Sequence, residues 1–272
     1  MNKKSLFARA AAAPHVVWSV LFIVAPLLFV FYYALTDSHG NFTLDNLFAL
    51  RDFGSTFFLS VSLALIATVI CILIGFPMAY FISRAKPKHQ KILLLLAMVP
   101  MWINLLIRTY SMMALLDDGG LINTLLGTDF RIIGTKGAVI FGMVYDFLPY
   151  MVLPIYTVVS KLDPRVLEAA QDLGCNSRQV LTQVVLPLSR SGIVSGITMV
   201  FVPCISTFYI SQKLGGGTFD LVGDAIERLF GNPLTYNVGA AISLVMMVLL
   251  LLSIAVMNHF AGSDEEEGRI LP

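Results

Sequence analysis

The chain has 272 residues, of which 57% are hydrophobic and 13% are charged, and its formal net charge is +1. Soluble globular domains contain about 45–50% apolar and about 25% charged residues. This composition excludes an ordinary soluble fold, which could not remove so much apolar surface from water.

Six apolar runs are long enough to cross a membrane as helices. A helix rises about 1.5 Å per residue, so about 20 residues cross the hydrocarbon core of roughly 30 Å. The runs cover residues 17–35, 57–83, 92–116, 137–160, 192–212 and 238–257. The sequence therefore predicts an all-α membrane protein with six transmembrane helices, in a domain that covers residues 1–261.

The first run follows Lys3, Lys4 and Arg9, an arrangement that also resembles the start of a secretory signal. We expect an uncleaved helix, because about 20 apolar residues are long for a signal core and no small-x-small cleavage site follows.

The distribution of basic residues predicts the orientation of the chain. With the N-terminus inside, 12 of the 18 Lys and Arg residues lie in the inner segments and five in the outer loops. Cytoplasmic loops retain positive charge, so both termini are expected in the cytoplasm. Residues 262–272 carry four consecutive acids and are predicted to form a solvated, disordered cytoplasmic tail.

Two charged residues lie inside the apolar runs, Arg108 in the third and Asp146 in the fourth. A residue count from the outer ends of these runs places them roughly 12 Å and roughly 13.5 Å deep. A charge near mid-membrane costs at least about 2.5–3.5 kcal/mol, so we hypothesise that Arg108 and Asp146 form an intramembrane charge pair. Two alternatives remain open: Asp146 as a carboxylate for substrate, and Arg108 extending outward to the membrane surface.

The loop between the fourth and fifth runs, residues 161–190, has the signals of two short helices. Asp163 is a candidate N-cap, Pro164 suits the first helical position, and Gly174 suits the left-handed residue that ends a helix. Ser177 is a second candidate N-cap, and Pro187 is expected to end the second helix.

Each short helix of this loop has an apolar side. The first contributes Val166, Leu167, Ala170 and Leu173, and the second contributes Val180, Leu181, Val184 and Val185. Helices of about ten residues are marginal alone in water, so these sides must pack against lipid, the rest of the chain or a partner.

The same loop resembles a known motif. Glu168, Ala169, Ala170, Gly174, Val184, Leu186 and Pro187 are similar, in identity and spacing, to the EAA motif of the permeases of ATP-binding-cassette (ABC) importers. The resemblance implies a type I ABC importer permease fold and a coupling helix that docks into a separate ATPase. The ATPase-coupling residues that it implies are Glu168, Ala169, Ala170, Asp172, Gly174 and Pro187.

Further stretches resemble the B-type permeases of spermidine/putrescine importers: residues 99–110, Leu162-Asp163, and Phe208-Tyr209-Ile210-Ser211 with Gly215-Gly216. The chain departs from that pattern at Gln212 and Lys213, where an acid is expected. A polyamine needs carboxylates and benefits from aromatic faces, although aromatic residues in membrane helices often only pack or form interface belts. The candidate substrate-pathway residues are Trp102, Asn104, Tyr110, Asp117, Asp118, Tyr145, Asp146, Tyr150 and Tyr209.

The sequence contains no phosphate-binding loop, since Gly134-Thr135-Lys136-Gly137 lacks the Gly-Lys-Ser/Thr order. We therefore expect a transport subunit rather than an enzyme, with no cofactor or metal of its own, and with ATP and Mg on two partner ATPase subunits. The resemblance also implies a second homologous permease, an extracytoplasmic substrate-binding protein and a bacterial cytoplasmic membrane. We expect contact with membrane lipid and none with nucleic acid. The alternatives are an ABC import permease for another small solute and a stand-alone secondary carrier.

Overall fold

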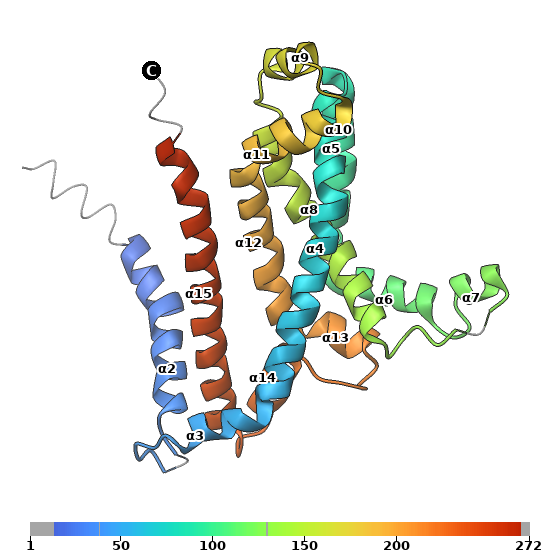
Figure 1. Ribbon diagram of the computed structural model, residues 1–272. Coiled ribbons are helices and arrows are strands. Elements are labelled where there is room, and N and C mark those ends of the chain that lie inside the picture. Colours follow the sequence, from blue (N-terminus) through green and yellow to red (C-terminus); the bar gives the residue numbers. More distant parts are fainter. Residues whose placement is uncertain (1–13, 38, 129, 268–272) are drawn as a thin grey trace, which may run out of the picture. The chain divides into compact units, whose positions relative to one another are not determined.

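A computed structural model describes residues 14–37, 39–128 and 130–267 of the chain. Within these ranges the protein has helices and no strand, apart from an isolated antiparallel bridge between Thr36 and Phe42. The predicted all-α class is confirmed (Figure 1).

The helices follow one another with short connections. In chain order they are η1 (Val20–Val24), α2 (Ala25–Ala34), α3 (Asp45–Phe48), η2 (Ala49–Phe53), α4 (Gly54–Arg84), α5 (Pro87–Trp102), α6 (Leu105–Leu116), α7 (Leu121–Leu126), α8 (Lys136–Val159), α9 (Pro164–Asp172), α10 (Ser177–Gln179), η3 (Val180–Val185), α11 (Leu186–Leu188), α12 (Arg190–Ser206), α13 (Tyr209–Leu214), α14 (Val222–Phe230) and α15 (Tyr236–Glu267).

Four helical segments of the described chain are long and apolar enough to cross a membrane as they stand: Pro14–Ala34, Asp45–Arg84, Lys136–Val159 and Tyr236–His259. Two further helix pairs qualify only as bent spans. Pro87–Trp102 meets Leu105–Leu125 at 92°, and Ser177–Leu188 meets Arg190–Ser206 at 72°. Counting each bent pair as one span gives a total of six.

The third apolar run is not the straight helix that we predicted. The backbone is extended at Ile103 and Asn104, and the Asn104 side chain accepts a hydrogen bond of 2.8 Å from the Leu106 amide. Asn104 is thus the N-cap of a new helix, α6, which hydrophobicity and run length alone do not reveal. The fifth run is interrupted as well, because α12 ends at Ser206 and α13 begins at Tyr209.

The chain divides into two compact units, residues 1–54 with 225–249, and residues 55–224 with 250–272. In the first unit, α2 packs on the beginning of α15 through three fully buried alanines, Ala34, Ala240 and Ala241. The Asn237 side chain donates hydrogen bonds to the carbonyls of Tyr33 and Thr36, which fixes the end of α2 against α15.

In the second unit, α8 and α12 run side by side (Figure 1). Glycines of α12 allow the close approach: a Cβ added at Gly192 would lie 2.9 Å from the Pro154 carbonyl oxygen, and one at Gly196 would lie 2.6 Å from the Met151 sulfur. Such small residues let helix backbones approach closely in membranes. Met151 and Ile155 of α8 are fully buried in this core.

Helix α15 continues to Glu267, so the first residues of the predicted acidic tail, 262–267, are helical in the structure. Residues 268–272 lie outside the described residues.

Candidate functional site

Helix α9 has the ends that the sequence predicts. The Asp163 carboxylate accepts a hydrogen bond of 3.0 Å from the Arg165 amide, and Pro164 is the first helical residue. At the other end Gly174 has φ +89°. Its amide donates to the Gln171 carbonyl at 2.8 Å, and the Cys175 amide donates to the Ala170 carbonyl at 3.1 Å. These two bonds form a Schellman motif, which requires the left-handed residue.

The second helix of the loop begins one residue earlier than predicted. Asn176, not Ser177, is the N-cap, and it forms a reciprocal capping box with Gln179: Asn176 Oδ1 accepts from the Gln179 amide at 2.9 Å, and Gln179 Oε1 accepts from the Asn176 amide at 2.8 Å. The capping box gives hydrogen-bond acceptors to two backbone amides that have no partner within the helix. The single hydroxyl of Ser177 could accept from only one, which favours Asn176 as the N-cap.

A π-helix, η3, forms the middle of this second helix and precedes Pro187. Proline has no amide hydrogen, and its ring clashes with the carbonyl four residues earlier in an α-helix. The wider π turn relieves that clash, so the helix continues past Pro187 to Leu188 instead of ending at the proline as predicted.

Side-chain burial separates the two sides of α9. Leu167 and Ala170 are each 8% exposed and face η3, whose Val185 is fully buried. Glu168 and Leu173 are exposed, Leu173 to 88%. The predicted apolar side is therefore only partly buried, because Val166 and Leu173 remain outside. The exposed side of α9, with Glu168, Ala169, Asp172 and Leu173, is available for contact with another protein.

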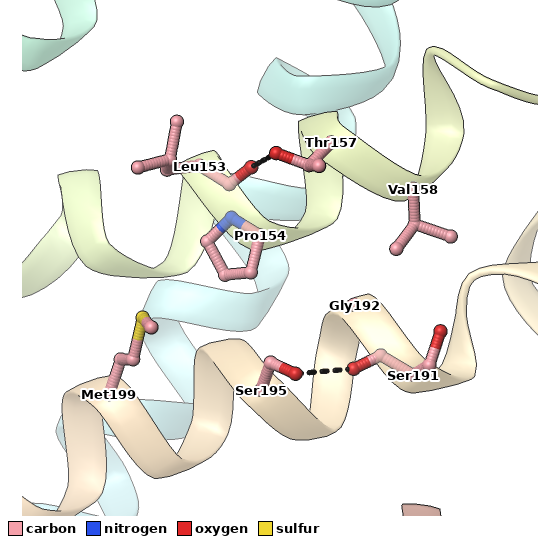
Figure 2. A pocket seen from close by; sticks show the side chains of 8 residues that line it. All are labelled: Leu153, Pro154, Thr157, Val158, Ser191, Gly192, Ser195 and Met199. Atoms are coloured by element: carbon pink, nitrogen blue, oxygen red, sulfur yellow. Dashed lines mark hydrogen bonds between the residues drawn. The ribbon is translucent and has the colours of Figure 1, made fainter. Parts of the chain in front are cut away.

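A groove between α8 and α12 lies beside the helix ends that carry the loop (Figure 2). The hydroxyls on its walls bond within their own helices: Thr157 donates to the Leu153 carbonyl and Ser195 to the Ser191 carbonyl, both at 2.8 Å. The groove is therefore mainly apolar. The loop is attached directly to these two packed helices.

The structure brings Arg108 of α6 and Asp146 of α8 together. Arg108 Nη1 lies 2.9 Å from Asp146 Oδ1, and the two side chains are 9% and 0% exposed. Within the described residues, the Asp146 carboxylate has no hydrogen-bond partner beyond this ion-pair contact with Arg108. The residue count that placed Arg108 and Asp146 at similar depths assumed that the third span is straight. The 92° bend in that span makes the assumption wrong. The contact between Arg108 and Asp146 in the structure replaces that count as the basis for the pair.

The remaining pathway candidates do not converge on one point. Trp102 is 77% exposed at the end of α5, and Asp117 and Asp118 are exposed beyond α6. Tyr145 is 40% exposed, and the Tyr150 ring lies 6.2 Å from the Phe147 ring. Asn104 serves as the cap of α6.

Tyr110 and Tyr209 do meet, and a residue outside the candidate set joins them. Their ring centroids are 6.3 Å apart in an edge-to-face arrangement, and the Lys213 ammonium lies over both rings. The spacing of Tyr209 and Lys213, four residues apart in a helix, was the only sequence signal for part of this cluster. Its contact with Tyr110 is tertiary.

The described residues include no group of three or more His, Cys, Asp or Glu side chains that could hold a metal ion. The three cysteines are free, with Cys71 and Cys204 buried.

Comparison with known protein families matches residues 71–262 to the family described as binding-protein-dependent transport system inner membrane component. The spermidine/putrescine transport system permease protein PotB of Haemophilus influenzae is 39% identical in an alignment of 253 positions that covers 88% of each chain. The protein of that name from Escherichia coli K12 is 36% identical over 88% of this chain and 92% of its own.

Solved structures with low sequence identity share the fold. A bacterial ABC transporter involved in the import of the acidic polysaccharide alginate matches with a TM-score of 0.77 and 18% identity, over 96% of each chain. The MetNI methionine ABC transporter matches with a TM-score of 0.58 and 15% identity, over 77% of this chain and 94% of that one.

Proposed function

Because this chain belongs to the family of binding-protein-dependent transport system inner membrane components, we propose that it is the permease subunit of an ATP-driven importer of spermidine and putrescine. The observation that carries the proposal is the 36–39% identity to permeases of spermidine/putrescine transport systems across 88% of this chain. The chain is a multi-pass protein of the cytoplasmic membrane with the type I ABC importer permease fold.

In the assembly that we propose, this chain and a second homologous permease form the pathway between them. Two ATPase subunits bind ATP and Mg, and an extracytoplasmic binding protein delivers the substrate. The absence of a phosphate-binding loop from the sequence supports a separate ATPase. The exposure of one side of α9 supports this helix as the docking site of that ATPase.

The contacts of α9 suggest how force is passed on. Glu168 and Asp172 present charge to the ATPase, and Leu173 presents an apolar side chain beside them. On its other side α9 packs against η3, which leads through α11 into α12. Movement of the ATPase subunits therefore acts on α8 and α12 together, and these helices change access to the pathway.

Uptake of labelled spermidine into proteoliposomes tests this proposal. The chain is reconstituted with its second permease, ATPase and binding protein, and uptake is expected only with ATP inside. Glu168→Ala should lower uptake about tenfold while the chain stays in the membrane, since losing one charged contact of about 1.4 kcal/mol changes an equilibrium tenfold.

Asp52→Ala provides a matched control, because Asp52 is an exposed acid remote in sequence from the loop. Its uptake should stay within twofold of the wild type. Uptake without the ATPase would instead identify a stand-alone carrier, and uptake of a different solute only would refute the polyamine substrate.

A further inference from the structure

A lysine ammonium of this chain is held by two aromatic rings. Lys213 Nζ lies 5.4 Å from the Tyr110 ring centroid and 5.8 Å from that of Tyr209. Both distances are within the roughly 6 Å at which the face of an aromatic ring attracts a cation. The Tyr110 hydroxyl also accepts a hydrogen bond from the Lys213 side chain, so both tyrosine rings and this hydroxyl stabilise the ammonium.

The position of Lys213 is fixed by the packing of its short helix, α13. A Cβ at Gly142 of α8 would lie 2.5 Å from a methyl carbon of Leu214, so the glycine admits α13 against α8. The Leu214 carbonyl accepts a hydrogen bond of 2.8 Å from the Gly134 amide. Ser211 donates to the buried Asp224 carboxylate at 2.9 Å. These contacts lie on both sides of Lys213 in the sequence and hold it near the rings.

This cluster lies at the end of α8 away from the α9 loop. Gly134, which bonds to α13, precedes the first residue of α8, whereas α9 follows its last residue, Val159. In the proposed assembly the α9 loop is cytoplasmic, so the cluster is at the extracytoplasmic entrance. Tyr110 is 52% exposed, and an ammonium on such a surface is costly against lipid, which favours a face toward the water-filled pathway.

We propose that Tyr110 and Tyr209 form a binding site for a primary alkylammonium group at this entrance, and that Lys213 occupies the site until the substrate displaces it. The lysine side chain is a flexible four-carbon chain that ends in a primary ammonium. One end of putrescine, and one end of spermidine, is the same aminobutyl group. The structure thus holds, on these two rings, the chemical group that the substrate presents.

The identity of the ligand rests on the proposed function, whereas the ammonium site rests on the contacts of the two tyrosine side chains. A tethered group competes at an effective concentration set by its tether, typically in the millimolar range for short flexible tethers. The binding protein delivers substrate directly to this entrance, where its local concentration can exceed that of the tethered ammonium. Lys213 then leaves the rings, and the entrance is filled again when the substrate has passed.

Thiol labelling of the reconstituted transporter tests the site. Lys213→Cys in a Cys175→Ser background leaves Cys71 and Cys204, which are buried. The measured quantity is the ratio of the rates at which the introduced thiol reacts with cationic 2-aminoethyl methanethiosulfonate and with neutral methyl methanethiosulfonate. Replacing both tyrosines by Leu should lower this ratio about fivefold, as expected for two cation–ring contacts.

Two matched controls separate ring chemistry from general effects. Replacing both tyrosines by Phe keeps the ring faces and should preserve the ratio. Lys136→Cys places the thiol at an exposed position at the same end of α8, where the ratio should not respond to the tyrosine changes. A ratio in the Lys213→Cys variant that is unchanged by the Leu replacements overturns the proposal.

Added putrescine tests the ammonium site and the proposed polyamine substrate separately. If the transported substrate is a polyamine, putrescine is expected to protect the thiol of the Lys213→Cys variant from the cationic reagent, but not that of the Lys136→Cys variant. A ratio that depends on the tyrosines without protection by putrescine would support the ammonium site and count against the polyamine substrate. Protection that survives the Leu replacements would place the polyamine elsewhere and overturn the ammonium site.

Discussion

At the scale of single residues, Arg108 and Asp146 form a buried ion pair between two helices. Both are nearly inaccessible, on α6 and α8, and each charge is the nearest partner of the other at 2.9 Å. Removing one member of a buried pair leaves a charge without compensation, whereas replacing both by apolar residues is often neutral. We therefore expect the pair to contribute mainly to the specificity with which α6 packs on α8.

Arg108→Leu is expected to lower the free energy of unfolding by about 3–5 kcal/mol, because Asp146 is left buried and unpaired. The double variant Arg108→Leu with Asp146→Leu should recover most of that loss. Denaturant unfolding in mixed micelles measures both values. Arg131→Leu, at an exposed arginine, should change stability by less than about 0.5 kcal/mol. A double variant as unstable as Arg108→Leu would show that the two charges do not act as a pair.

At the scale of elements, the contact between α8 and α12 connects the α9 loop to the transmembrane core. Its closest approach to the backbone of α8 is at Gly192, where an added Cβ would lie 2.9 Å from the Pro154 carbonyl oxygen. The carbonyl of Pro154 belongs to the backbone and cannot rotate away from an added methyl group, so α12 must shift as a whole.

Gly192→Ala should destabilise the protein by about 1–3 kcal/mol, the usual cost of overpacking. The matched control is Gly137→Ala, also in a helix of this unit, where an added Cβ would meet nothing closer than Thr135 Oγ1 at 3.7 Å. Thermal unfolding of the two variants in the same detergent provides the comparison. Equal midpoints would mean that α12 does not depend on this close approach.

Elements with local signals were predictable from the sequence, and their arrangement was not. Asp163 and Gly174 mark the ends of α9 because a cap and a left-handed glycine act within a few residues. The break at Asn104 was missed, since a cap inside an apolar run does not change the hydrophobicity. The cluster of Tyr110 with Lys213 depends on packing between helices about 100 residues apart in the chain, which no local pattern encodes.

At the scale of the whole molecule, α8 connects two regions of different chemistry. Its C-terminal end leads into the exposed, acidic side of α9, and its N-terminal end lies beside the aromatic cluster that holds the Lys213 ammonium. In the proposed transporter, one end contacts the ATPase and the other contacts the arriving substrate. We expect α8 to couple these two ends if the subunit works by alternating access.

Photocrosslinking from Leu173 tests the central claim, that α9 docks on a separate ATPase. A photoreactive residue replaces Leu173, which is 88% exposed on α9, or Leu125, which is 82% exposed on α7. In membranes that contain the complete transporter, the Leu173 position is expected to crosslink to a protein with a phosphate-binding loop, identified by mass spectrometry. A crosslink to that ATPase from Leu125, and none from Leu173, would contradict the account.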